Sequence, residues 1–380
     1  MNHRERVLTT LSHREPDRAP RYASLTPFVR DEFVRRTDEQ NPAVYWDWDL
    51  ASVGFRRPDP LPDLHDRFGE FYTDRDCEWV LEWGESDYPP EWGVATRPAH
   101  LYHLSAPLAP MEAFTDLEQI EAYPFPDYLN EWRHDHLERE VLRLQDAGYP
   151  VTASAGWIFQ TVCTLRTRVK LFMDFYDHPE FARALFRRVT DIRIAQATRL
   201  AEAGVDMISL NDDVGTQKSL IMSVEMWRTW LKPYLAELIA AIHRVNPDIH
   251  FRYHSDGLLT PIIPDLIEIG VSSLITVQAE SMNVFEIKAR FGEQISMEGT
   301  VGLQGELMLG TPDQVRQMVK AQCEGLMPGG GWIASPGNGI TPDIPWENLV
   351  AFFEALEEYS YYRSAPSHGF GQACKGERNR

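Results

Sequence analysis

The sequence predicts an α/β fold, specifically a (β/α)8 barrel with an elaborated N-terminal region. From about residue 135 onward, helical periodicity alternates with short apolar runs, and this alternation is typical of a parallel sheet. At least six such runs form one series, and no G-x-G-x-x-G follows the first of them, which favours a barrel over a doubly wound sheet. Polar or acidic residues follow most of these runs, as at the mouth of a barrel.

The N-terminal region, residues 1–135, is rich in Pro, Trp and Asp and has weak periodicity. A first helix is expected over 4–11, ending before Pro16, and a strand near 19–24. Thr115-Asp116-Leu117-Glu118 predicts a capping box and a short helix. The aromatic residues of this region are expected to pack rather than to line a ligand cage.

The remaining elements follow in order from about residue 132. Helix start signals include Thr311 before Pro312, with Gln314 three residues past the cap, and Pro345 at a first helical position. The expected helices cover 132–147, 179–202, 224–245, 312–324 and 345–359. The expected strands cover 151–155, 206–210, 249–253, 273–277, 294–297 and 331–334. The two strands that complete a barrel are expected in the N-terminal part. Residues 1–363 are predicted to form one domain, and 364–380 a disordered tail.

Composition excludes several classes of protein. The chain of 380 residues has a formal net charge of −20, which argues against a general binder of nucleic acid or anionic membranes. Its four cysteines have no C-x-x-C spacing, so the sequence contains neither a local zinc-knuckle motif nor a local redox pair. The charged N-terminus does not resemble a signal peptide, and no apolar stretch approaches a membrane span. We therefore expect a cytoplasmic protein with no nucleotide-cofactor motif.

Ionisable and polar side chains follow five consecutive predicted strands. Because parallel strands deliver their carboxyl ends to one mouth, these side chains are expected to converge. They comprise Asp212, Asp213 and Gln217 after the second predicted strand of the series, His254 and Asp256 after the third, Gln278 after the fourth, Glu298 after the fifth and Asn338 after the last.

The catalytic candidates are His254, Asp256 and Glu298, and the same three residues are the candidate metal ligands. Each candidate also has a structural interpretation. An aspartate after a strand often caps a turn, a histidine is often a buried structural group, and Asn338 in Pro-Gly-Asn-Gly fits a positive-φ turn. The spacing of His254 and Asp256 favours function.

Several segments, spread over nearly the whole chain, resemble the uroporphyrinogen decarboxylase superfamily, which includes the methylcobamide:thiol methyltransferases. The resemblance implies a TIM barrel, and it suggests a homodimer. The segments are Arg4–Leu8 with Pro16–Pro20, Asp212–Gln217 with Trp227-Arg228 and Lys232-Pro233, His254–Gly257, Met297–Val301 with Gly310–Val315, and Gly329–Ile333 with Pro345–Asn348.

Two departures from the superfamily pattern bear on function. The true decarboxylases have an Arg-Gln-Ala-Gly-Arg segment near the N-terminus, where this chain has Pro20–Leu25 with only Arg21. Arg56 and Arg57 are further candidate cations, but a substrate with eight carboxylates needs many cationic partners. Uroporphyrinogen is therefore not the expected substrate.

The methyltransferases hold zinc through His-x-Cys and a later Cys. Here Asp256 stands at the first cysteine position and Asn338 at the second. A set of His, Asp, Glu and Asn is harder than a thiolate set, and it suits zinc or another divalent ion in a more open site. A hydrogen-bonding acid/base site without a metal is the alternative.

The resemblance leads to three hypotheses. The first is a methyltransferase-like enzyme that acts on a small substrate, with a corrinoid carried by a partner protein. The second is a decarboxylase in which Arg21 holds a carboxylate and Asp47 or Asp49 contacts the substrate, unless these aspartates only cap helices. The third is a non-catalytic barrel that binds a corrinoid, a porphyrin or another small ligand. In the first hypothesis, Asp212, Asp213, Gln217, Gln278 and Asn338 line the substrate site.

Overall fold

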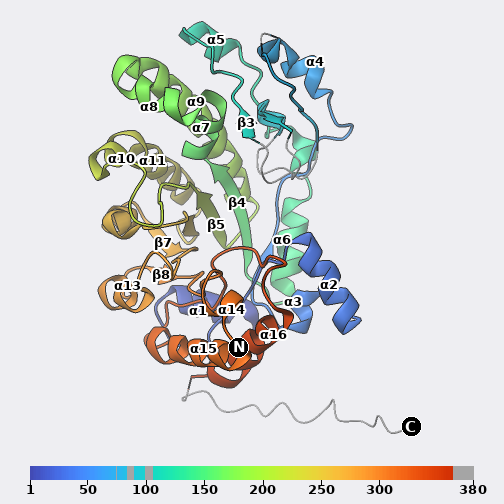
Figure 1. Cartoon of the computed structure of the whole chain (residues 1–380), viewed down its shortest axis with the longest axis vertical. Helices are drawn as coiled ribbons and strands as arrows, with labels where there is room; N and C mark the ends of the chain where they lie inside the picture. The colour runs from blue at the N-terminus through green and yellow to red at the C-terminus, as the bar shows by residue number, and fades with distance from the viewer. Residues whose placement is uncertain (74, 84–89, 99–105, 363–380) are drawn as a thin grey trace.

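Six parallel strands form the central sheet, in the order β1-β4-β5-β6-β7-β8. The computed structural model describes residues 1–73, 75–83, 90–98 and 106–362 (Figure 1). The strands of the sheet are β1 Ala51–Ser52, β4 Val151–Trp157, β5 Met207–Asn211, β6 His250–His254, β7 Val271–Leu274 and β8 Ser296–Met297. Two further strands, β2 Ala95–Arg97 and β3 Ala106–Leu108, form an antiparallel pair in the N-terminal region.

Two extended segments close the sheet into a barrel. Parallel bridges join Met297 to Trp332, and Arg21 to Ala334. On the other side, the N–H of Asp49 donates to the carbonyl of Arg21, next to β1. Residues 21–25 and 332–336 thus occupy the two remaining strand positions, and the barrel predicted from the alternating pattern is confirmed. The segment expected as a strand over 331–334 pairs only through isolated bridges.

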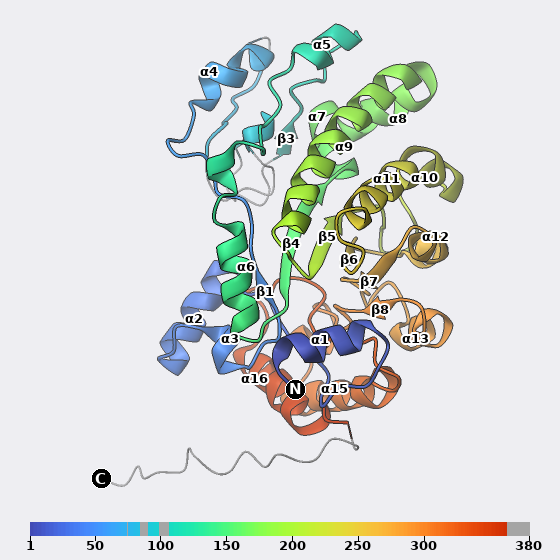
Figure 2. The ribbon, with the colours of Figure 1, turned by 180° about the vertical axis from the view of Figure 1, so that it is seen from behind.

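Most helices surround the outside of the sheet, whereas α4 and α5 lie away from it, on the side of β3 (Figures 1 and 2). In order along the first half of the chain, the helices are α1 His3–Leu11, α2 Pro27–Thr37, α3 Pro42–Tyr45, α4 Leu64–Phe68, α5 Leu117–Ala122, α6 Leu137–Asp146, α7 Phe159–Arg166, α8 Arg168–Asp177 and α9 Pro179–Glu202. Those of the second half are α10 Val224–Trp230, α11 Lys232–His243, α12 Ile263–Glu268, α13 Val284–Phe291, α14 Glu306–Leu309, α15 Pro312–Leu326 and α16 Trp346–Tyr359. No described helix is both long enough and apolar enough to cross a bilayer.

Local capping explains where several helices begin. The side chain of Thr311 accepts from the N–H of Gln314, and Gln314 returns the bond, so α15 starts where the sequence predicted. The predicted capping box at Thr115 is displaced by one residue. Asp116 is the N-cap of α5: its carboxylate accepts from the N–H of Gln119, and the Gln119 side chain completes the box.

Other boundaries differ from the sequence-based expectation. The helix expected over 224–245 is two helices, and the break falls at Leu231, just before the Lys232-Pro233 pair. Proline lacks an N–H and clashes with the preceding turn, so it starts a new helix here. Helices α7 and α8 were not predicted. The helix expected from 132 begins at Leu137, after a short 3-10 turn over Glu131–Arg133.

The N-terminal region shares its core with the barrel. One continuous cluster of buried apolar side chains includes Phe68, Tyr72 and Trp92 of this region together with Trp227 and Trp332 of the barrel. All three of these tryptophans are fully buried, as packing residues should be. The predicted tail over 364–380 lies outside the described residues.

A network of ion pairs seals the amino-terminal end of the barrel. Asp49, which precedes β1, is fully buried and accepts from Arg6 Nη1 at 2.6 Å, Arg18 Nη1 at 2.7 Å and the backbone N–H of Arg21 at 2.8 Å. His3 of α1 also lies 2.9 Å from this carboxylate. Helix α1 therefore closes the base of the barrel through a carboxylate that has four partners.

The Asp49 network makes stability depend on acid pH. Burial alone would raise the pKa of Asp49, but the hydrogen bond from His3 and the charges of Arg18 and Arg6 lower it to about 2. A carboxylate whose pKa is lower in the folded chain stabilises that state above the unfolded pKa of 3.8. This contribution is lost as the pH falls from about 4 through about 2.

We expect Asp49→Asn to lower the free energy of unfolding by about 3–5 kcal/mol at neutral pH, because it leaves buried arginines without their counter-charge. Denaturant unfolding as a function of pH measures this effect. The variant should also lose less stability than the wild type between about pH 4 and pH 2.

Asp47→Asn is the matched control, because Asp47 joins the same network through Arg18 but its side chain is 52% exposed. It should cost no more than about 1 kcal/mol. Equal losses in the two variants would contradict a special role for Asp49.

Candidate functional site

Three predicted residues converge at the carboxyl ends of β5 and β6. His254 Nε2 lies 3.7 Å from Asp213 Oδ1 and 4.0 Å from Asp256 Oδ1. One possible ligand atom from each of the three residues lies within 4.8 Å of the others. All three side chains are partly exposed, so a ligand has access to them. We call Asp213, His254 and Asp256 the mouth triad.

Close packing of two loops fixes the triad. The N–H of Asp256 donates to Asp213 Oδ1 at 3.0 Å, and the N–H of Asp212 donates to the carbonyl of His254 at 2.9 Å. Gly257 has φ +79°, and a Cβ built on it would lie 2.5 Å from the carbonyl oxygen of Thr216. Only glycine allows the two loops to approach this closely in this conformation.

Further polar groups hold the triad side chains. Asn338 Nδ2 donates to Asp256 Oδ1 at 2.9 Å, so the last strand end reaches the site as the sequence predicted. Thr276 Oγ1 lies 2.7 Å from His254 Nδ1. The Trp157 ring meets the His254 ring edge-to-face, with the centroids 5.8 Å apart. Neither Thr276 nor Trp157 was among the predicted site residues.

Asp212 lies behind the triad rather than within it. Its side chain is buried, and its Oδ1 accepts from the N–H of Gln160 at 3.0 Å in the first turn of α7. Burial raises the pKa of Asp212 to about 7, although the N–H groups of Gln160 and Phe159 act in the opposite direction. Asp212 thus caps the start of α7, which lies earlier in the chain, and not the turn after β5 that was considered for it.

The two predicted glutamines support the loops of the mouth. Gln278 Oε1 accepts from the N–H of Gly257 at 2.9 Å, beside the triad. Gln217 Oε1 accepts from Ser281 Oγ at 2.8 Å and is exposed to solvent. Each of these bonds links the loop that follows one strand to the loop that follows another.

Glu298 is not brought to His254 and Asp256, although all three were predicted as one ligand set. It is fully buried inside the barrel, where its carboxylate receives two hydrogen bonds from Arg252 and one of 2.7 Å from Ser273 Oγ. Burial alone would lower the pKa of Arg252, but the charge of Glu298 raises it above its usual value. Asp213 takes the place expected for Glu298.

Arg252 was missed, although the sequence held a signal for it. It lies two residues before His254 on β6, and alternate residues of a strand point to the same face. Besides Glu298, its guanidinium donates to Thr152 Oγ1 at 3.2 Å, Ser209 Oγ at 3.4 Å and the Tyr22 hydroxyl at 3.3 Å. The interior below the mouth is therefore polar and cross-linked.

Arg21, Asp47 and Asp49 were assigned to the substrate site, and the structure places them at the other end of the strands. Arg21 Nη2 donates to Glu357 at 2.8 Å and lies 3.3 Å from Asp47 Oδ2. Asp47 and Asp49 precede β1 and hold the arginines of the base. Ion pairing with their neighbours explains why they do not reach the mouth.

The mouth triad fits a divalent cation. Two donors that each lie about 2.1 Å from one ion are separated by roughly 3–4 Å. The separations of 3.7 and 4.0 Å from His254 Nε2 to the two carboxylates match this span. The donors are one imidazole nitrogen and carboxylate oxygens, and among the described residues no cysteine joins them. This set suits zinc or a harder divalent ion better than a thiolate site does.

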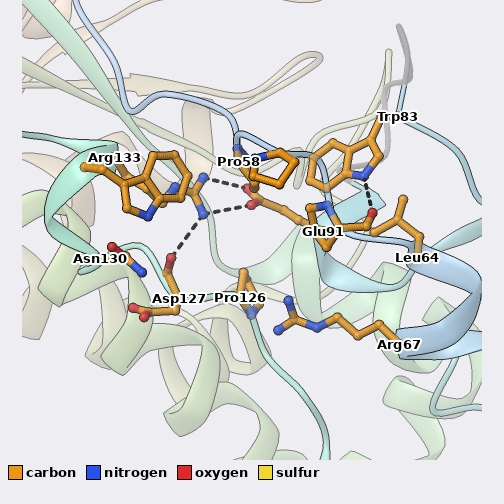
Figure 3. A pocket seen from close by; sticks show the side chains of 12 residues that line it. Pro58, Leu64, Arg67, Trp83, Glu91, Pro126, Asp127, Asn130 and Arg133 are labelled. Carbon is orange, nitrogen blue, oxygen red and sulfur yellow. Dashed lines mark hydrogen bonds and ion pairs between the residues drawn. The ribbon is translucent and has the colours of Figure 1, made fainter.

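A separate cavity of about 230 Å³ lies in the N-terminal region (Figure 3). Proline and tryptophan side chains form much of its wall, and Arg133 spans one side of it through its ion pair with Glu91. None of the predicted site residues lines this cavity.

The family model described as uroporphyrinogen decarboxylase (URO-D) matches residues 105–359. A methylcobamide:CoM methyltransferase of Methanosarcina barkeri is 28% identical over 170 residues, which are 45% of this chain and 47% of that protein. A uroporphyrinogen decarboxylase of Pelodictyon phaeoclathratiforme is 24% identical over 192 residues, which are 49% of this chain and 51% of that protein. The chain thus spans about half the length of these curated relatives.

Among solved structures, a methyltransferase from Methanosarcina mazei superposes with a TM-score of 0.64 at 17% identity. The superposition covers 94% of this chain and 99% of that one. At this identity the likeness shows the fold, and it agrees with the barrel described above.

We expect Gly257→Ala to disturb the mouth, because the new Cβ would meet the Thr216 carbonyl in addition to the strain of a positive φ. Gly329→Ala is the matched control, since Gly329 has φ +75° but nothing within 4 Å of a built Cβ. The control should cost about 1–2 kcal/mol of unfolding free energy. The Gly257 variant should cost about 1–3 kcal/mol more. Equal costs by denaturant unfolding would argue against close loop packing.

Proposed function

Because the chain belongs to the uroporphyrinogen decarboxylase family, we propose that it is a methyltransferase-like barrel enzyme whose mouth triad holds a divalent metal. The observation that carries this proposal is the convergence of Asp213, His254 and Asp256 at the carboxyl ends of neighbouring strands. These ends are where barrel enzymes build their active sites.

The choice of the methyltransferase-like branch rests on two supports. One relative is named a methylcobamide:CoM methyltransferase. In addition, His254-Ser255-Asp256-Gly257 stands where such enzymes carry their His-x-Cys metal motif. The proposed substrate is a small nucleophile that exchanges a methyl group with a corrinoid carried by a partner protein. The homodimer remains a prediction from the resemblance.

Each residue of the site has a proposed role. A bound divalent cation would lower the pKa of a nucleophile and polarise its oxygen or sulfur. Asp213, His254 and Asp256 would hold the cation, while Asn338 keeps the carboxylate of Asp256 in place. Trp157, whose ring meets the His254 ring edge-to-face, would limit the access of water to that side of the imidazole. Gln278 keeps the loop that carries Asp256 against its neighbour.

Decarboxylation is the second candidate, because another relative is named a uroporphyrinogen decarboxylase. Arg21 was the candidate for binding a substrate carboxylate. At the base of the barrel it forms ion pairs with Asp47 and Glu357 instead. This placement favours the methyltransferase-like proposal. A non-catalytic binding barrel is the third candidate.

We expect protein freed of metal by a chelator to bind one Zn²⁺ per chain in calorimetric titration. Asp213→Asn, His254→Ala and Asp256→Asn should each weaken this binding by about 10–100-fold or more, because each removes either the ligand nitrogen or the negative charge of a ligand oxygen. Asp47→Asn makes the same chemical change at the base and should bind Zn²⁺ as the wild type does.

Methyl transfer from a methylated corrinoid to a free thiol, followed by the visible spectrum of the corrinoid, tests the reaction. Loss of transfer in His254→Ala would support the proposal. Absence of bound Zn²⁺ together with unchanged activity in His254→Ala would overturn it. Release of carbon dioxide from uroporphyrinogen, without methyl transfer, would establish the second candidate instead.

A further inference from the structure

We infer that Thr276 is a positioning residue that fixes the tautomer of His254, so that Nε2 presents a lone pair to the mouth triad. This inference rests on the proposed function, since the lone pair matters most if a cation binds there. It adds a residue outside the metal ligands and assigns to it a chemical task.

One arrangement of protons satisfies both hydrogen bonds of Thr276. Its Oγ1 lies 2.7 Å from His254 Nδ1 and 3.1 Å from the carbonyl oxygen of Gly337. A carbonyl oxygen only accepts, so the single hydroxyl proton is donated to Gly337. The hydroxyl oxygen then accepts from His254, which requires a proton on Nδ1. In the neutral ring, Nε2 is left without a proton.

The opposite arrangement is less favourable. If the hydroxyl donated to Nδ1, the carbonyl of Gly337 would lose this donor. The carbonyl of Gly337 is partly buried, and losing its partner there costs up to roughly 1–3 kcal/mol. Thr276 itself is only 1% exposed, which leaves little room for water to replace the lost bond.

Tight backbone packing keeps Thr276 in place. The N–H of Ile275 donates to the carbonyl of Tyr253, and that of Val277 donates to the carbonyl of Glu298, so the segment is held on both sides. Gly299, at φ +65°, packs against the carbonyl of Ile275, where a Cβ would lie at 2.2 Å. The threonine therefore cannot shift without disrupting three strand ends.

One loop thereby orients two residues of the triad. Gly337 acts on His254 through the Thr276 hydroxyl, and the neighbouring Asn338 acts directly on Asp256. Metal-binding histidines commonly donate their second ring N–H to such a partner, which sets the tautomer and the ring orientation. Here the partner is a hydroxyl backed by a carbonyl.

Thr276→Val tests the inference, because valine keeps the shape of the side chain and removes the hydroxyl. Thr276→Ser is the matched control that keeps the hydroxyl. The first readout is the ¹⁵N spectrum of the histidine rings in metal-free protein, at a pH where the ring of His254 is neutral. The signals of His254 are identified by their loss in His254→Ala. We expect the Nδ1–H form in the wild type and in the serine variant, and a mixture of tautomers in the valine variant.

The second readout is the calorimetric affinity for Zn²⁺. Thr276→Val should weaken binding by about 10–100-fold, the usual effect of removing such a partner, and Thr276→Ser should stay close to the wild type. Thermal unfolding of both variants checks that the fold is retained.

The two readouts separate the inference from the proposed function. If the wild type binds no Zn²⁺ but shows the Nδ1–H form, the metal proposal fails and the tautomer inference stands. An Nε2–H form in the wild type, or an unchanged tautomer in Thr276→Val, overturns the inference whatever the metal does.

Discussion

The buried pair of Arg252 and Glu298 is the constraint around which the interior of the barrel is organised. Two charges removed from water are tolerated only when the geometry is good and the remaining hydrogen-bonding groups are satisfied. Arg252 meets this condition because its guanidinium donates hydrogen bonds to Glu298, Thr152, Ser209 and Tyr22. The pair thereby ties β6 to the segment after β8 and to the first extended segment. It also fixes which face of β6 points into the barrel. His254, two residues further along β6, is on the same face and reaches the mouth.

The two ends of the strands have different tasks. At the base, carboxylates are neutralised by arginines of α1 and of the first extended segment, which stabilises the closed barrel. At the mouth, the ion-pair partner of Asp213 and Asp256 is His254, and among the described residues neither carboxylate pairs with an arginine or a lysine. These two carboxylates therefore attract a cation to the mouth. The carboxylates at the base do not, because arginines already neutralise them.

The sequence predicted the fold and part of the site, because both depend on local patterns. Residues at or just beyond the carboxyl ends of strands, such as His254, Asp213 and Asp256, share the mouth because parallel strands end at one side. The depth of Glu298 was not predictable, since the residue also follows a strand and only its partner Arg252 draws it into the interior. Arg21, Asp47 and Asp49 were misplaced for a related reason. Asp47 and Asp49 precede β1, and Arg21 is the first residue of an extended segment. Without the pairing across the barrel, the sequence does not reveal to which end these residues belong.

Closure of the barrel joins Arg21 to Ala334, and Leu25 to Ile340, so the first and last strand positions come from opposite ends of the chain. During synthesis on a ribosome, the first segment emerges long before its partner exists. Until then the central sheet has two open edges, and such edges invite pairing with other chains. Chaperones that shield nascent strands would matter more for this protein than for one built from local hairpins, and a ribosome that stalled before residue 332 would leave a chain prone to aggregation.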